Sequence, residues 1–119
     1  YQSVQDRFAE EIANETVEIH RKRSTEALRQ LDDNSLDYVY IDTTHGLEQT
    51  RDELELCRQK VQPNGIIAGH DYCVGIPPKR TSFGVIAAVH EFCIKHDWRI
   101  TYLTFETPGH RSFALERMG

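Results

Sequence analysis

The 119-residue sequence predicts an α/β protein built on a mainly parallel sheet, with an antiparallel hairpin at its C-terminal end. Two observations predict this fold class. Helix-like and strand-like apolar patterns alternate along most of the chain. Two alternating segments on either side of Thr107-Pro108-Gly109 then give a hairpin signal. Because no repeat or linker divides the sequence, we expect one domain over residues 1–119.

The first elements are predicted from apolar spacing and turn residues. Apolar residues four positions apart indicate a helix over about residues 3–13, and a short strand is expected over residues 16–20. Ser24 or Thr25 can cap the next helix. Leu36 to Ile41 is almost entirely apolar and β-favouring, as is typical of a strand buried on both faces of a parallel sheet.

The remaining elements follow the same alternation. A helical stripe covers about Leu47 to Lys60, and Pro63-Asn64-Gly65 ends it. The later elements are a short buried strand over Ile66–Gly69, a helix capped by Ser82, and strands over Trp98–Leu103 and Ser112–Glu116.

Composition excludes several classes of partner. The formal net charge of −5 gives no electrostatic reason to bind nucleic acid or an anionic membrane. The sequence contains no bilayer-length apolar run and opens with no signal-peptide pattern. Cys57 and Cys93 fall on apolar helix faces, as expected of free thiols in a reducing compartment, and Cys73 is interpreted as a bystander in a loop. We therefore expect a cytoplasmic protein.

Two acidic residues follow neighbouring predicted strands. Asp42 follows Leu36–Ile41, and Asp71 lies just beyond Ile66–Gly69. If these strands pair, both carboxylates open at the carboxyl edge of the sheet, where open α/β sheets bind ligands. Two close carboxylates repel each other unless a proton, a donor or a cation lies between them, and oxygen ligands suit Mg²⁺ or Mn²⁺. The two carboxylates therefore predict a site at the carboxyl edge of the sheet that holds a proton, a hydrogen-bond donor or a divalent cation.

Two histidines lie beside these acids. His45, three residues after Asp42, can return over the same edge and take a proton from a substrate hydroxyl. His70 joins the site as a ligand only if its strand has ended, because consecutive strand residues point to opposite faces. Simpler structural roles stay open: Asp42 as a helix cap, Asp71 in an Asx turn, and both histidines as ordinary hydrogen-bonding residues.

The segment from Leu36 to His45, LDYVYIDTTH, resembles the "D-hydrophobic-IDG-x-H" motif of methyltransferase family 24, a group of class I S-adenosylmethionine-dependent methyltransferases. Further matches follow in order at Asp52, at Val61 to Ile67 and at His70-Asp71-Tyr72. The resemblance covers about Val17 to Phe92. It implies a Rossmann-like sheet with helices on both faces, of which this chain is an incomplete C-terminal portion.

The resemblance also implies roles for particular residues. Asp42 and Asp71 would hold a divalent cation, with Tyr72 at a position often filled by a polar ligand, and His45 would be the base. Ser24 and Thr25 would border the adenine of S-adenosylmethionine. The reaction implied is methyl transfer to the oxygen of a small hydroxylated molecule, and Lys79 and Arg80 could bind an anionic acceptor or could be solvated loop charges.

The sequence departs from the family pattern in ways that predict weak cofactor binding. Thr43 and Asn64 replace usual glycines, and no G-x-G occurs anywhere. The first two strands of the family fold are therefore expected to be missing. The Leu36–Ile41 strand would then have an open edge, which predicts either a homo-oligomer or direct pairing of residues 16–20 with that edge.

Two other functions compete with this interpretation. A metal-dependent hydrolase could use Asp42, His45, His70 and Asp71 as mixed ligands for Zn²⁺ or Fe²⁺, although no strong hydrolase motif is present. A non-catalytic remnant of a methyltransferase would form a stable oligomer that is indifferent to cofactor and metal.

Overall fold

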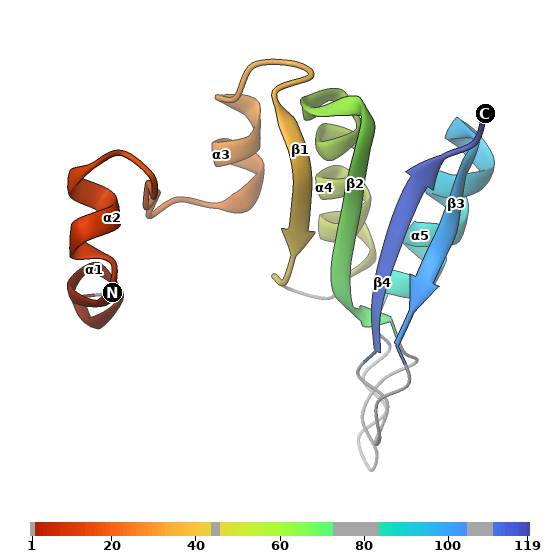
Figure 1. Cartoon of the computed structure of the whole chain (residues 1–119). Helices are drawn as coiled ribbons and strands as arrows, with labels where there is room; N and C mark the ends of the chain where they lie inside the picture. The colour runs from red at the N-terminus through yellow and green to blue at the C-terminus, as the bar shows by residue number, and fades with distance from the viewer. Residues whose placement is uncertain (1, 44–45, 73–83, 105–110) are drawn as a thin grey trace, which may run out of the picture.

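The computed structural model describes residues 2–43, 46–72, 84–104 and 111–119. Its elements, in chain order, are α1 (Gln2–Arg7), α2 (Ala9–Ala13), α3 (Ser24–Arg29), β1 (Leu36–Ile41), α4 (Leu47–Lys60), β2 (Val61–Tyr72), α5 (Val85–His96), β3 (Trp98–Leu103) and β4 (Arg111–Arg117). Helices and strands alternate around one sheet, which confirms the predicted α/β, Rossmann-like fold class (Figure 1).

In the described part of the chain, the sheet has four strands in the order β1-β2-β4-β3. β1 and β2 are parallel and are joined by the crossover helix α4, with Ile41 opposite Gly69 at the carboxyl end. β4 runs antiparallel to both β2 and β3, so the last strand of the chain lies between two earlier ones. The expected adjacency of the strands before Asp42 and Asp71 is therefore confirmed, as is the C-terminal hairpin.

The hydrophobic core lies between the sheet and the helices α3, α4 and α5. Leu54 of α4, Val89 of α5 and Ile67 of β2 are fully buried there, with Leu28 of α3 at its margin. α4 and α5 lie behind the sheet in Figure 1. Side chains on the other face are more exposed, including Tyr38, Tyr40 and Tyr102. In the described part of the chain, the helices that pack on the sheet therefore cover one face, whereas the family resemblance implied helices on both. The predicted burial of β1 on both faces was wrong, because Tyr38 and Tyr40 lie on the uncovered face.

Strong local patterns predicted several element boundaries correctly. The bounds of β1, α4 and β3 are those expected from the sequence. β2 is longer than expected, because Val61 already pairs with Leu36 before the Pro63–Gly65 irregularity. α5 has Gly84 as its N-cap residue, and the predicted cap Ser82 lies outside the described residues.

The prediction of a strand over residues 16–20 was wrong, since that segment has no regular secondary structure. Its first amides are tied to the preceding helix: the backbone N–H groups of Thr16 and Val17 both donate to the carbonyl oxygen of Glu11, at 2.9 and 3.1 Å. The expected pairing of this segment with β1 is therefore absent from the described residues. β1 pairs with β2 along one edge, and its other edge has no described strand beside it.

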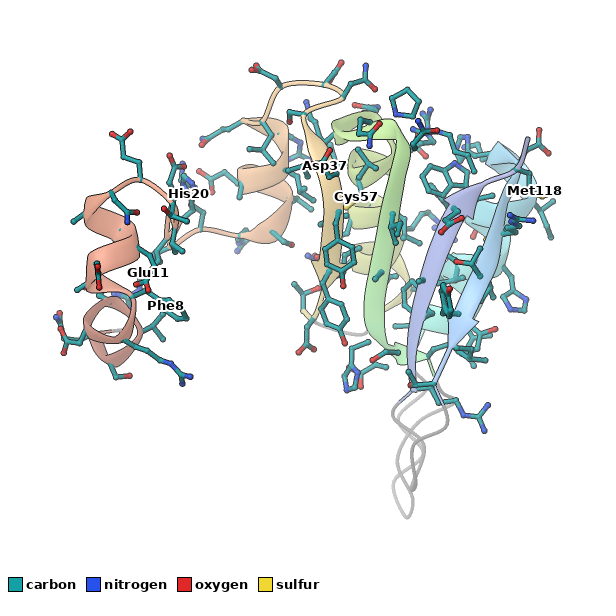
Figure 2. The ribbon with its side chains drawn as sticks, viewed as in Figure 1. Phe8, Glu11, His20, Asp37, Cys57 and Met118 are labelled. Atoms are coloured by element: carbon teal, nitrogen blue, oxygen red, sulfur yellow. The ribbon has the colours of Figure 1, made fainter. Side chains whose placement is uncertain are left out.

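α1 and α2 replace the single predicted N-terminal helix and are interrupted at Phe8. They contact each other but no other described element, and none of their residues is buried. Figure 2 shows Phe8 and Glu11 here, well away from the sheet. None of the described helices is long and apolar enough to cross a membrane.

Arg117, at the end of β4, ties the C-terminal strand to the corner between α4 and β2. Its guanidinium donates to the carbonyl oxygens of Arg58, Gln62, Pro63 and Val61, at 3.0, 2.9, 3.1 and 3.5 Å. The same group lies 4.6 Å from the centroid of the Trp98 ring. A planar, forked donor can make these contacts together, which a lysine ammonium cannot reproduce.

Candidate active site

A large cleft lies between α3 and the open edge of β1. Its volume is about 430 Å³, within the range of small-molecule sites. Most of its wall is apolar, with Leu28 and Leu31 on one side and Val39 and Ile41 on the other. The polar groups that border it come from the residues Glu18, His20, Ser24, Gln30, Tyr40, Thr43 and Glu53. The cleft can therefore hold an apolar body and meet a few polar groups.

Ser24 and Thr25 were predicted to border the cofactor. Ser24 lines the cleft, and its hydroxyl oxygen accepts a hydrogen bond from Gln49 Nε2 at 3.2 Å. Thr25 is half-buried but is not among the residues that line the cleft. Neither caps α3: Arg23 is the N-cap residue and no side chain makes a cap hydrogen bond, so the predicted cap was wrong.

A second, much smaller cavity lies at the carboxyl ends of β1 and β2. Asp42, His70 and Asp71 all line it, together with Thr43 and Phe113. Its volume of about 10 Å³ leaves room for roughly one water molecule. Asp42 does not cap α4, whose N-cap residue is Gly46. The parallel pairing thus brings Asp42 and Asp71 to one cavity, as the strand order predicted, while their chemical roles stay predictions.

His70 is linked to the open face of the sheet. Its Nδ1 lies 3.2 Å from the hydroxyl oxygen of Ser112 in β4, which in turn lies 2.9 Å from the hydroxyl of Tyr40 in β1. On its other side, Nε2 lies 3.8 Å from a carboxylate oxygen of Asp71. Asp71 has a φ of 61°, a left-handed conformation that interrupts the regular alternation of β2. This irregularity explains how both residues border one cavity.

The cation implied by the family resemblance needs several converging ligands. Among residues 2–43, 46–72, 84–104 and 111–119, no three His, Cys, Asp or Glu side chains converge to hold a metal ion. The described residues therefore do not form a metal site by themselves. His45, the predicted base, lies outside the described residues, as do Cys73, Lys79 and Arg80.

Glu53 is a polar group of the cleft that the sequence interpretation missed. It belongs to α4, is only 1% exposed, and accepts hydrogen bonds at both carboxylate oxygens from the Thr43 hydroxyl, at 2.7 and 2.8 Å. A signal was present, because Glu53 falls on the same helical stripe as Thr50 and Cys57. Because α4 has several acidic residues, Glu53 did not stand out as a candidate in the sequence.

Burial raises the pKa values of three side chains, Cys57, Cys93 and Tyr72. Burial, and then the charge of Glu53, raises the pKa of Cys57 to about 12, and burial also raises the pKa of Cys93. Figure 2 labels Cys57 on α4, behind the sheet. Burial likewise raises the pKa of Tyr72, whose hydroxyl pairs with His90 Nε2 of α5. Tyr72 thus contacts α5 and does not line the Asp42 cavity.

Several solved structures that resemble this chain are described as methyltransferases or methylases. A proposed rRNA methylase from Clostridium thermocellum matches 96% of this chain over 67% of its own length, at 14% identity and a TM-score of 0.67. A proposed type 11 methyltransferase from Sulfolobus solfataricus matches 77% of the chain over 56% of its length, at 14% identity and a TM-score of 0.61. The fold is therefore that of class I methyltransferases.

One similar structure was determined with a cofactor. A proposed DNA modification methylase from Thermus thermophilus, complexed with S-adenosyl-L-methionine, matches 85% of the chain at 13% identity and a TM-score of 0.61. The chain covers 54% of that protein's length. It thus spans little more than half of the Sulfolobus and Thermus proteins.

The family follows from the sequence itself. The model of methyltransferase family 24, described as a methyltransferase domain, matches residues 1–72, which is more than half of the 119 residues. The chain belongs to this family. The match begins before the expected resemblance from Val17 and ends before Phe92. No curated protein matches the chain.

Proposed function

We propose that these 119 residues are the C-terminal part of an S-adenosylmethionine-dependent methyltransferase domain that methylates an oxygen of a small hydroxylated acceptor. The cleft between α3 and β1 carries this proposal. It opens beside the carboxyl end of β1, next to Asp42, on a sheet of the methyltransferase family. Ligands of open α/β sheets bind at this end.

The chemistry assigns separate tasks to the two cavities. The bound cofactor would supply an electrophilic methyl group, which an acceptor oxygen attacks in line as the carbon–sulfur bond breaks. Ser24, with Thr25 beside it, would border the cofactor in the cleft. Asp42 and Asp71 would orient the acceptor's hydroxyl group, the only part of the acceptor that fits the small cavity, and His45 would take its proton.

Divalent-metal assistance by Mg²⁺ or Mn²⁺ is a further part of the proposal, with Asp42, Asp71 and His70 as ligands. Because the described residues alone form no site, we assign no step of the reaction to a cation. The test is metal content and titration. Weak, exchangeable Mg²⁺ or Mn²⁺ binding that is lost in Asp42→Asn supports assistance. Tight stoichiometric zinc favours the hydrolase instead.

We also propose that, without a ligand in the cleft beside it, the open edge of β1 joins the chain into a homo-oligomer. An unpaired strand edge presents free N–H and C=O groups, and Tyr38 and Tyr40 of this strand are exposed. Light scattering after gel filtration should show a dimer, whereas a monomer at about 100 µM would contradict the proposal. A cytoplasmic location, and the absence of nucleic-acid or membrane partners, are proposed from the sequence alone.

Cofactor binding tests the main proposal. Because no G-x-G turn is present, we expect S-adenosylhomocysteine to bind the 119-residue chain weakly, with a Kd above about 100 µM. In NMR titrations, the shifted amides should cluster around Ser24, Val39 and Thr43. Shifts elsewhere, or no binding at about 10 mM, would refute the proposed function. Calorimetry showing micromolar affinity would refute the partial-domain interpretation.

A further inference from the structure

Glu53 is a buried acid with few hydrogen-bond donors among the residues that the structure describes. Its side chain lies on the inward stripe of α4, next to the fully buried residues Leu54 and Cys57. Moving a carboxylate from water into such surroundings is costly unless hydrogen bonds or a counter-ion replace the water. The partners of Glu53 therefore indicate whether it is a satisfied structural group.

Few of the described residues donate a hydrogen bond to Glu53. Within the described part of the chain, the Thr43 hydroxyl is its donor, and this one proton is shared between the two carboxylate oxygens. An ionised carboxylate has about four acceptor positions. The ion pairs among the described residues do not include Glu53. Among the described residues, part of its acceptor capacity is thus left over, on a side chain that is only 1% exposed.

That capacity lies at the cleft. Glu53 and Thr43 both line it, where Val39 and Ile41 form an apolar wall. Thr43 and Ile41 also line the small cavity of Asp42, so the Thr43–Glu53 pair stands where the two cavities meet. A ligand in the cleft that carries an N–H or O–H group would meet an acceptor that is already oriented.

We propose that Glu53 is the polar anchor of the cleft, and that its carboxylate accepts a hydrogen bond from an N–H or O–H group of the bound ligand while Thr43 fixes its rotamer. The ligand class is a small molecule with an apolar body and at least one such donor. That this ligand is an S-adenosyl compound rests on the proposed function, whereas the acceptor role of Glu53 does not.

The stability of the ligand-free protein distinguishes a structural role of Glu53 from a ligand-binding role. If Thr43 satisfied the carboxylate, removing it would destabilise the fold. If the carboxylate awaits a ligand, replacing it by an apolar side chain of similar size removes a desolvated charge and stabilises the ligand-free protein. The Thr43 hydroxyl would not be left buried without a partner, because Thr43 is exposed.

The experiment compares Glu53→Met and Glu53→Gln with the wild-type chain. The matched control is Glu48→Gln, an exposed acid in the first turn of the same helix. We expect Glu53→Met to raise the Tm of the ligand-free chain by about 3 to 6 °C. Both Glu53 variants should weaken binding of S-adenosylhomocysteine, measured by NMR titration, about tenfold or more. Glu48→Gln should change neither quantity.

The outcomes distinguish a failure of the proposed role of Glu53 from a failure of the proposed cofactor. A lower Tm in Glu53→Met overturns the anchor, because Glu53 is then structural. Unchanged affinity in both Glu53 variants also overturns it. A wild-type chain that does not bind S-adenosylhomocysteine, together with a raised Tm in Glu53→Met, rejects the proposed cofactor and supports an acceptor for another donor-bearing ligand.

Discussion

Replacing Gly84 by alanine should loosen the junction between α4 and α5. A Cβ atom built on Gly84 would lie 2.3 Å from both the Cα and the backbone nitrogen of Leu47, the first residue of α4. These are backbone atoms, so no side-chain rotation can relieve the overlap. The start of α5 and the start of α4 must move apart, and the segment that carries Asp42 leads directly into α4.

The expected magnitude combines two opposing effects. Overpacking costs up to about 3 kcal/mol when the neighbours cannot yield. The φ of Gly84 is −90°, which alanine tolerates, so the reduced entropy of the unfolded chain returns about 0.7 kcal/mol. The net loss is about 2 kcal/mol, which corresponds to a Tm lower by roughly 8 °C in a domain of this size.

Thermal and urea unfolding, followed by circular dichroism, would measure this loss. Gly46→Ala is the matched control, because a Cβ at Gly46 meets no atom within 4 Å and its φ is −74°. The control should lie within about 0.5 kcal/mol of the wild type. Equal stability of the two variants would refute the steric argument and the close approach of α5 to α4.

Three other perturbations test separate features. Because the pKa of Cys57 is raised to about 12 from 9.0, its contribution to stability is full below about pH 9 and falls as the pH rises toward 12. Alkaline urea titrations should therefore show a loss approaching about 1.4 kcal/mol per pH unit, absent in Cys57→Ala. Arg117→Lys should lower the free energy of unfolding by about 1 to 2 kcal/mol in urea titrations, through loss of the contacts to Trp98 and four carbonyl groups. Ser112→Ala removes the link between Tyr40 and His70, so the His70 ring signals should shift in NMR spectra, whereas in Tyr40→Phe they should shift less.

Each of these three tests has an outcome against it. Identical alkaline profiles for wild type and Cys57→Ala would show that this thiol does not resist ionisation. An Arg117→Lys variant as stable as wild type would mean that a positive charge alone, without the forked guanidinium, stabilises the corner between α4 and β2. Unchanged His70 signals in Ser112→Ala would place the histidine elsewhere.

The sequence predicted those elements whose local pattern agrees with their tertiary surroundings. The bounds of β1 follow from its mostly apolar, β-favouring sequence, although its predicted burial on both faces was wrong, and α4 has a clear stripe through Leu54 and Cys57. The failure at residues 16–20 has a different origin. A strand depends on a neighbouring strand, which no local pattern reveals, and here the amides of Thr16 and Val17 bond to a helix end instead.

The candidate site was predictable in part for the same reason. Parallel pairing of two predicted strands was enough to bring Asp42 and Asp71 to one edge. The bond from Thr43 to Glu53 was not predictable, since it depends on how far α4 rotates as it packs against the sheet. The contact of His70 with Ser112 joins residues 42 positions apart and follows from the placement of β4 inside the sheet.

The position of β4 also determines when the sheet can be completed during synthesis. β3 leaves the ribosome before β4, yet in the described sheet its strand partner is β4. The edge of β2 away from β1 also has no partner until β4 is available. β1, α4 and β2 can associate early, while two strand edges stay open until Arg111–Arg117 emerges. A ribosome that stalls before Arg111 would thus hold a nascent chain in which β2 and β3 have unpaired strand edges. Chaperones should bind this stalled chain most strongly.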